Sequence, residues 1–202
     1  MSNLNLIATT TFGLEACVKR EVMRLGFENI KTSDGKVEFT GDESAIPKAN
    51  LWLRCAGRVH LKIGEFKAIT FDELFEKTKA LPWEEWIPVD GKFTVVGKSV
   101  KSTLFSVPDC QAIVKKAVVE KLKQTYNVDW FDETGAEYTI QVALLKDTAT
   151  LTIDTTGSGL HKRGYRADAM IAPLKESLAA AMVELSYWNK DRILFDPMCG
   201  SG

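Results

Sequence analysis

Residues 192–202 read Arg192-Ile193-Leu194-Phe195-Asp196-Pro197-Met198-Cys199-Gly200-Ser201-Gly202, which is the most specific pattern in the chain. The apolar run at its start predicts a buried strand, and the acid, the proline and the Gly-Ser-Gly that follow predict a turn. Glycines directly after a buried strand let the backbone approach a ligand at distances where a Cβ atom would collide. In doubly wound α/β folds, nucleotide-like ligands bind at this position, beyond the carboxyl end of a strand. We therefore expect the first strand of an α/β domain, with its neighbouring strands lying beyond Gly202.

The whole phrase at 195–202 distinguishes this turn from an ordinary surface loop, which is the alternative for a bare Gly-X-Gly. A P-loop is excluded because no Gly-Lys-Ser/Thr follows at the required spacing. The phrase Phe-Asp-Pro-Met-Cys-Gly-Ser-Gly resembles the first motif, D-P-x-C-G-S-G, of the S-adenosylmethionine-dependent methyltransferases that methylate amino groups. The resemblance implies that the turn wraps the amino-acid end of S-adenosylmethionine through Asp196, Pro197, Cys199, Gly200, Ser201 and Gly202.

The composition is that of a globular protein with one or two domains: 202 residues, of which 45% are hydrophobic and 26% charged. No apolar run approaches the ~20 residues that cross a bilayer, and the N-terminus lacks the pattern of a signal peptide. The four cysteines, at 17, 55, 110 and 199, form no Cys-X-X-Cys pair and have no neighbouring histidine cluster. We therefore expect no membrane segment, no metal site and a cytoplasmic location, where thiols stay reduced.

Hydrophobic periodicity predicts two α+β domains before the final segment. In residues 1–68, strands are expected at 4–9, 36–40 and 58–64, and a helix at 12–26. A second helix, with Asp42 or Ser44 as its N-cap, runs through 49–53, and the whole pattern suggests a small ferredoxin-like domain. In residues 69–156, a short helix starts near 71, and a longer helix runs from Asp109, its expected N-cap, to 126. Strands are expected at 92–98, 138–144 and 148–154, the last two forming a hairpin through Lys146 and Asp147. A linker at 157–172 and a helix that starts at Pro173 lead to the terminal strand.

Basic residues are unevenly distributed, although the formal net charge is only −1. Lysines dominate residues 91–126, and the linker is basic again at 161–166. Such a pattern can create a basic face on a neutral protein, which suits a phosphate backbone; the alternative is a solvated helix surface. The candidate RNA-binding residues are Lys98, Lys101, Lys115, Lys116, Lys162, Arg163 and Arg166 for phosphates and Tyr165 for stacking on a base. The alternative for Tyr165 is a ring packed at a domain interface.

Three phrases together resemble the THUMP-domain RNA methyltransferases, specifically the bacterial guanine-N2 type that often carries the label of adenine-specific DNA methylase. The phrases are Thr-Thr-Thr-Phe-Gly-Leu-Glu at 9–15, Leu-His-Lys-Arg-Gly-Tyr-Arg at 160–166 and the terminal motif at 195–202. The resemblance implies an N-terminal ferredoxin-like domain at 1–68, a THUMP RNA-binding domain at 69–156, a linker at 157–172 and the start of a Rossmann-like methyltransferase domain at 173–202. It also implies RNA, in particular ribosomal RNA, as partner and S-adenosylmethionine as cofactor of the complete protein.

The catalytic motif of that family, D/N-P-P-Y, is absent from these 202 residues. No catalytic residue is therefore assigned, and we expect the chain alone to be inactive. Two alternatives stay open: a stand-alone RNA-binding THUMP module without catalysis, and a DNA adenine-N6 methylase, which the THUMP-like part disfavours.

Overall fold

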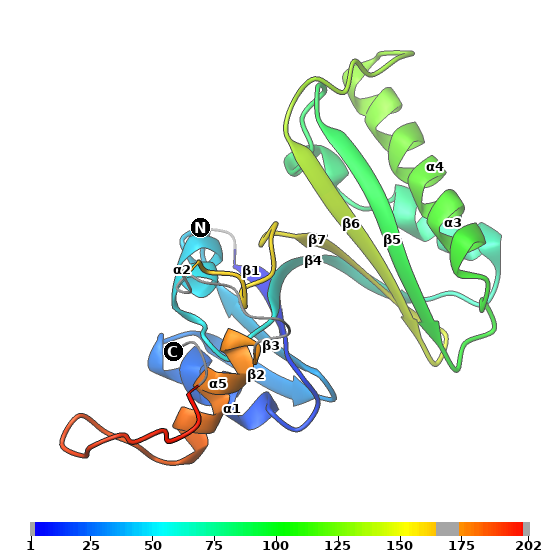
Figure 1. Ribbon diagram of the computed structural model, residues 1–202. Coiled ribbons are helices and arrows are strands. Elements are labelled where there is room, and N and C mark those ends of the chain that lie inside the picture. The colour runs from blue at the N-terminus through cyan, green and yellow to red at the C-terminus, as the bar shows by residue number, and fades with distance from the viewer. Residues whose placement is uncertain (1–2, 165–173, 200–202) are drawn as a thin grey trace. The chain divides into compact units, whose positions relative to one another are not determined.

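The computed structural model describes residues 3–164 and 174–199 (Figure 1). The chain folds into two compact units. Unit 1 contains Met1–His60 and Thr155–Gly202, and unit 2 contains Leu61–Asp154. The chain therefore starts in unit 1, builds unit 2 and returns to unit 1.

Unit 1 is an α+β fold around a mostly antiparallel sheet. Its elements are β1 (Leu4–Thr9), α1 (Glu15–Arg24), β2 (Glu28–Ser33), β3 (Lys36–Gly41), α2 (Ala45–Trp52), the first residues of β4 (Arg58–Lys67), and α5 (Glu176–Leu185). The strand order is β2-β3-β1-β4, and β3 is antiparallel to both β1 and β2. Of these four strands, β1, β3 and β4 were expected from the sequence and β2 was not. That strand was missed because it lies at the sheet edge with five of its six side chains exposed, so it has no apolar alternation.

Helix α1 covers the sheet of unit 1 with one apolar stripe. Cys17, Val18 and Val22 are buried on this stripe, and the strand residues Leu6 and Phe39 are buried as well. The helix begins at Glu15, three residues later than expected, because residues 10–14 form a loop that polar contacts hold. The Glu15 carboxylate accepts hydrogen bonds from the amides of Gly13 (2.9 Å) and Gly35 (2.7 Å). Gly13 has a φ of +90°, a conformation that few residues with a Cβ atom adopt.

Unit 2 pairs two helices with one face of a four-stranded sheet (Figure 1). Its elements after β4 are α3 (Phe71–Lys79), the short 3-10 helix η1 (Trp83–Glu85), β5 (Lys92–Val100), α4 (Val107–Tyr126), β6 (Glu137–Leu145) and β7 (Thr148–Asp154). The strand order is β4-β7-β6-β5, with β5 parallel to β6. The β6–β7 hairpin is confirmed, and its turn residues Lys146 and Asp147 have positive φ angles of 49° and 61°.

The core of unit 2 lies between α3, α4 and the sheet. Trp83 is completely buried there, and its indole Nε1 donates to the carbonyl of Thr78 at 2.8 Å. Helix α4 contributes Cys110, Val114, Ala117, Val118 and Leu122 to this core. The predicted N-cap was wrong: α4 begins at Val107 after Ser106, and Asp109 lies in the first turn. Proline at the second helical position explains the earlier start, because its fixed φ suits the first turn.

The final segment departs from its prediction. Helix α5 is present from Glu176, whereas Pro173 lies outside the described residues. The buried strand expected at 193–195 is wrong for this structure: residues 193–196 have no regular secondary structure, and Ile193 is 96% and Phe195 81% exposed. A parallel strand needs the hydrogen bonds of a neighbouring strand, and the described residues offer none at this place.

Candidate nucleic-acid interface and cofactor segment

The two neighbouring lysines of α4 point to different sides of that helix. The Nζ atom of Lys115 lies 5.8 Å from the ring centroid of Phe93, on β5, and that of Lys116 lies 5.5 Å from the ring centroid of Phe75, on α3. Both lysines are exposed, so the ring contacts hold each ammonium group without removing it from solvent. The structure therefore leaves both cations accessible but does not direct them to one patch.

Lys98 lies on the face of the sheet opposite to α4. Its neighbour Gly97 faces the helix, because a Cβ atom at that position would lie 3.1 Å from side-chain carbons of Gln111 and Val107. Successive strand residues point to opposite faces, so the side chain of Lys98 is directed away from α4. Lys98 and the two α4 lysines consequently do not form the single basic face that the sequence suggested.

A second lysine cluster lies where β5 and β6 end. Val100 pairs with Leu145 in the β5–β6 register, and each is followed by a lysine, Lys101 and Lys146. The amide of Lys146 donates to the carbonyl of Val100 at 3.2 Å, so the two lysine backbones are held side by side. Lys98 lies three residues before Lys101 on the same strand end.

The loop after β5 is held in place and displays an aromatic ring. Asp147 Oδ1 accepts from the amide of Thr103 at 2.6 Å, and Ser99 Oγ donates to the carbonyl of Leu104 at 2.7 Å. The next residue, Phe105, is 82% exposed. We call Lys98, Lys101, Phe105 and Lys146 the loop-end cluster of unit 2. Three exposed lysines and one exposed ring, all at the end of β5 and β6 or in the loop after β5, suit a polyanion that carries planar bases.

Sequence reasoning missed Phe105 and Lys146. The signal for Phe105 was a large apolar residue in a polar loop just before the helix-starting proline. Lys146 lies in a hairpin turn that was recognised, but its nearness to Lys101 depends on the parallel pairing of β5 with β6, which no local pattern reveals.

The linker residues have contrasting surroundings. Lys162 is exposed, whereas the guanidinium of Arg163 points at backbone carbonyls. It donates from Nε to Leu160 (3.1 Å), from Nη1 to Leu51 (2.8 Å) and from Nη2 to Leu53 (2.5 Å). The structure thus places the forked donor group of Arg163 on the protein itself. Tyr165 and Arg166 lie outside the described residues.

The candidate cofactor segment is described only through Cys199. Asp196 accepts a hydrogen bond from the amide of Met198 at 2.9 Å, so its carboxylate closes a turn. Asp196, Pro197 and Cys199 are exposed, whereas Gly200, Ser201 and Gly202 lie outside the described residues. The turn that Asp196 closes is exposed, so its backbone N–H and C=O groups can bind the charged amino-acid end of S-adenosylmethionine. The described residues therefore fit one part of that cofactor and show no complete site.

The described residues contain neither a membrane-spanning helix nor a metal-binding cluster. In the ranges 3–164 and 174–199, no helix is long and apolar enough to span a membrane. Within the same ranges, no group of three or more histidine, cysteine or acidic residues is arranged to hold a metal ion.

Comparison with known proteins assigns a domain to each of three successive stretches. Residues 5–60 match the RlmL ferredoxin-like domain, residues 68–154 match the THUMP domain, and residues 163–202 match the RMKL-like methyltransferase domain. In chain order, these matches are a ferredoxin-like domain, a THUMP domain and the start of a methyltransferase domain.

The chain spans about half the length of the similar proteins that follow. The Bacillus subtilis (strain 168) protein named "Putative RNA methyltransferase YpsC" is 59% identical over 204 residues, which cover all of this chain and 53% of that protein. A crystal structure from Listeria monocytogenes str. 4b F2365, described as a predicted N6-adenine-specific DNA methylase, superposes with a TM-score of 0.95 at 58% identity and covers 99% of this chain and 53% of the other. The crystal structure of SMU.472, described as a methyltransferase complexed with SAH, has a TM-score of 0.88 at 44% identity and covers 95% of this chain and 51% of the other.

Proposed function

We propose that this chain is the RNA-recognition part of an S-adenosylmethionine-dependent RNA methyltransferase that works in the cytosol. The observation that carries the proposal is the succession of a ferredoxin-like domain, a THUMP domain and the start of a methyltransferase domain in one chain. The name of the B. subtilis relative supports RNA as the substrate class, and the SAH complex of SMU.472 supports the cofactor. We further propose that the substrate is ribosomal RNA and that the methylated atom is N2 of a guanine.

The loop-end cluster is the proposed RNA contact of unit 2. Lys98, Lys101 and Lys146 would neutralise phosphates, which gives affinity and salt dependence but little choice of sequence. Phe105 would stack on an unpaired base, because its ring is exposed on a loop that Asp147 holds in place. Lys115 and Lys116 would add phosphate contacts along the two sides of α4. Further contacts are proposed for Lys162, and for Tyr165 and Arg166 outside the described residues.

The cofactor would be held at 196–202 in the complete protein. S-Adenosylmethionine supplies an electrophilic methyl group when it is bound. The task of this chain's residues is to bind the amino-acid end of the cofactor through the backbone of the turn that Asp196 closes. Because D/N-P-P-Y is absent from these 202 residues, we propose that the chain alone transfers no methyl group.

A binding experiment tests the RNA part of the proposal. The affinity of the chain is measured for a structured RNA and for a DNA duplex of equal length, at several matched salt concentrations. We expect tighter binding to RNA. The double variant Lys101→Glu/Lys146→Glu should bind RNA about tenfold more weakly, with a salt slope smaller by about 2, because two phosphate contacts are lost.

The matched control is Lys19→Glu, which reverses an exposed charge on α1 of unit 1. Equal affinity of the double variant and the wild-type chain would overturn the assignment of the loop-end cluster. Equal affinity for RNA and DNA would remove the preference on which the proposed substrate rests.

A second candidate function is DNA adenine-N6 methylation, which the description of the Listeria structure favours. Transfer of labelled methyl groups from S-adenosylmethionine by the native polypeptide distinguishes the two. Labelled N2-methylguanine in RNA supports the first candidate, and labelled N6-methyladenine in DNA supports the second. A native polypeptide with the mass of this chain, 22.5 kDa, that binds RNA and labels neither would be a stand-alone RNA-binding module.

A further inference from the structure

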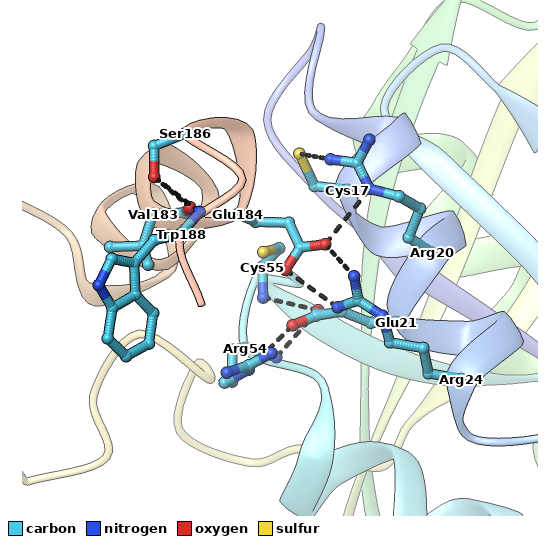
Figure 2. Close-up of polar contacts among 10 residues, drawn as sticks. All are labelled: Cys17, Arg20, Glu21, Arg24, Arg54, Cys55, Val183, Glu184, Ser186 and Trp188. Carbon is cyan, nitrogen blue, oxygen red and sulfur yellow. Dashed lines mark hydrogen bonds and ion pairs between the residues drawn. The ribbon is translucent and has the colours of Figure 1, made fainter. Parts of the chain in front are cut away.

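One carboxylate connects α5 with α1 inside unit 1 (Figure 2). Glu184, in the last turn of α5, accepts a forked pair of hydrogen bonds from the guanidinium of Arg24: Nη2 to Oε1 at 2.6 Å and Nη1 to Oε2 at 3.0 Å. Nε of Arg20 lies 3.3 Å from the same Oε1 atom. One acid thus neutralises two bases that are one turn apart on α1.

The geometry of this ion pair is favourable for a contact near the surface. The side chain of Glu184 is only 13% exposed, compared with 58% for Arg24 and 32% for Arg20. The hydrogen bonds from Arg24 foremost, and the charges of the nearby arginines, lower the pKa of Glu184 from its ordinary value. A forked arginine–carboxylate pair fixes orientation as well as distance, which a single contact between point charges does not.

A second acid close to this ion pair, Glu21 of α1, binds other partners. Glu21 is 4% exposed, and its carboxylate accepts from Nε of Arg54 (3.1 Å) and from the amides of Arg54 (3.1 Å) and Cys55 (3.0 Å). Figure 2 shows that these contacts lie beside the Glu184 contacts but use different donors. Among the contacts described for residues 3–164 and 174–199, Glu184 is therefore the acid that receives the fork of Arg24.

A second tie holds the beginning of α5. Oε2 of Glu176, the first residue of the helix, accepts from the amide of Arg163 at 3.2 Å. Arg163 is itself attached to unit 1 through the carbonyls of Leu51 and Leu53. Helix α5 is therefore attached to the rest of unit 1 near both of its ends.

From these contacts we infer that Glu184 is a positioning residue. It docks the first helix of the methyltransferase domain on α1 of the ferredoxin-like domain, so that the ferredoxin-like domain is a platform for the catalytic domain. The docking stands on the observed contacts alone. Its consequence for methyl transfer rests on the function proposed above.

Hydrogen exchange of the α5 amides in the 202-residue chain tests the docking. Glu184→Gln and Arg24→Gln should each exchange about fivefold faster in α5, because each removes the charge-assisted fork. In a chain that also carries Arg20→Gln, which removes the second base beside Glu184, the charge swap Glu184→Arg/Arg24→Glu should restore most of the protection, since it reverses the pair and keeps its attraction. Two controls remove an exposed charge of the same unit: Glu43→Gln beside α2 and Lys19→Gln on α1.

Three outcomes would overturn the inference. The first is unchanged exchange in Glu184→Gln. The second is a swap variant no better protected than the single variants. The third is equal acceleration in Leu61–Asp154, which would show a general loss of stability rather than undocking of α5.

A pH profile separates positioning by charge from simple packing. Because its folded-state pKa is lowered, Glu184 stabilises the docked helix fully above its ordinary pKa of about 4.3, and this contribution is lost as the pH falls through the lowered value. The charged and titratable groups that face it are Arg20, Arg24 and Glu21 from α1 and Arg54 and Cys55 from the segment before β4. After correction for intrinsic exchange, protection of α5 should fall in acid for the wild-type chain and change less in Glu184→Gln. Identical profiles would refute a role of the charge.

The consequence for catalysis is measured on the native polypeptide. In Glu184→Gln, RNA affinity and the KM for RNA should stay within about twofold of wild type, because Glu184 is not part of the proposed RNA contact. The value of kcat should fall in proportion to the docked fraction, by at most about fivefold, because a fivefold shift of the docking equilibrium cannot lower that fraction further. A raised KM with unchanged kcat would overturn the positioning role. If the wild-type protein methylates no RNA, the proposed function fails, and the exchange experiment still decides the docking.

Discussion

The replacement of Arg163 by lysine decides between two roles for this side chain: RNA binding, which the sequence suggested, and attachment of the linker, which the structure shows. The guanidinium donates to three backbone carbonyls, those of Leu51, Leu53 and Leu160. A lysine keeps the positive charge for a phosphate. Its single ammonium group cannot reach three carbonyls that diverge around a planar fork.

The expected loss follows from these contacts. Hydrogen bonds to charged groups contribute ~1.5–3 kcal/mol each, and about half of that is appropriate at a partly exposed site. If lysine retains one of the three bonds, two are lost, which gives a destabilisation of about 2 kcal/mol. In native-state hydrogen exchange, that loss corresponds to roughly 30-fold faster exchange of the amides around α2.

The assay therefore combines hydrogen exchange with RNA binding. Arg163→Lys should accelerate exchange in unit 1, leave Leu61–Asp154 unchanged and keep the RNA affinity within about twofold. Lys162→Ala, which removes the exposed neighbouring cation, is the matched control and should not change the exchange. Wild-type exchange together with RNA binding weakened tenfold would refute the attachment role and return Arg163 to the RNA contact.

Three further predictions concern the fold and its titratable groups. Gly97→Ala should destabilise unit 2 by about 1–2 kcal/mol in urea unfolding, because its Cβ would lie 3.1 Å from Val107; an unchanged midpoint would mean that α4 yields freely. Burial raises the pKa of the Cys55 thiol to about 12, so at pH 8 a thiol reagent should modify exposed Cys199 in the folded chain and Cys55 only after unfolding. Hydrogen bonds from backbone amides, foremost that of Gly35, lower the pKa of Glu15 below its ordinary value of about 4.3. The stability that it confers is present above that value and is lost as the pH falls through the lowered pKa, which an NMR titration of its carboxyl carbon would show.

The sequence alone determined the order of the domains and most of the regular elements. The hairpin of β6 and β7 is visible because two alternating segments flank Lys146 and Asp147, and a tight turn is a local property. Helix α4 was expected because its apolar stripe is local as well, although its start was placed at Asp109 and not at Val107. The terminal motif at 195–202 led to the methyltransferase assignment through a phrase of eight residues.

The contacts of the individual lysine and arginine side chains depend on the tertiary structure and could not be predicted from the sequence. Lys115 and Lys116 are adjacent in sequence, yet each lies over a ring of a different element, and Lys101 meets Lys146 only because β5 pairs with β6. In the sequence, Arg163 cannot be distinguished from a phosphate-binding arginine. In the structure, its guanidinium donates to the carbonyls of Leu51 and Leu53, which are more than a hundred residues away in the chain. Local patterns encode periodicity and turn chemistry. The partner of a long polar side chain depends on which distant segment folding brings within about 3 Å, and no spacing in the sequence records that distance.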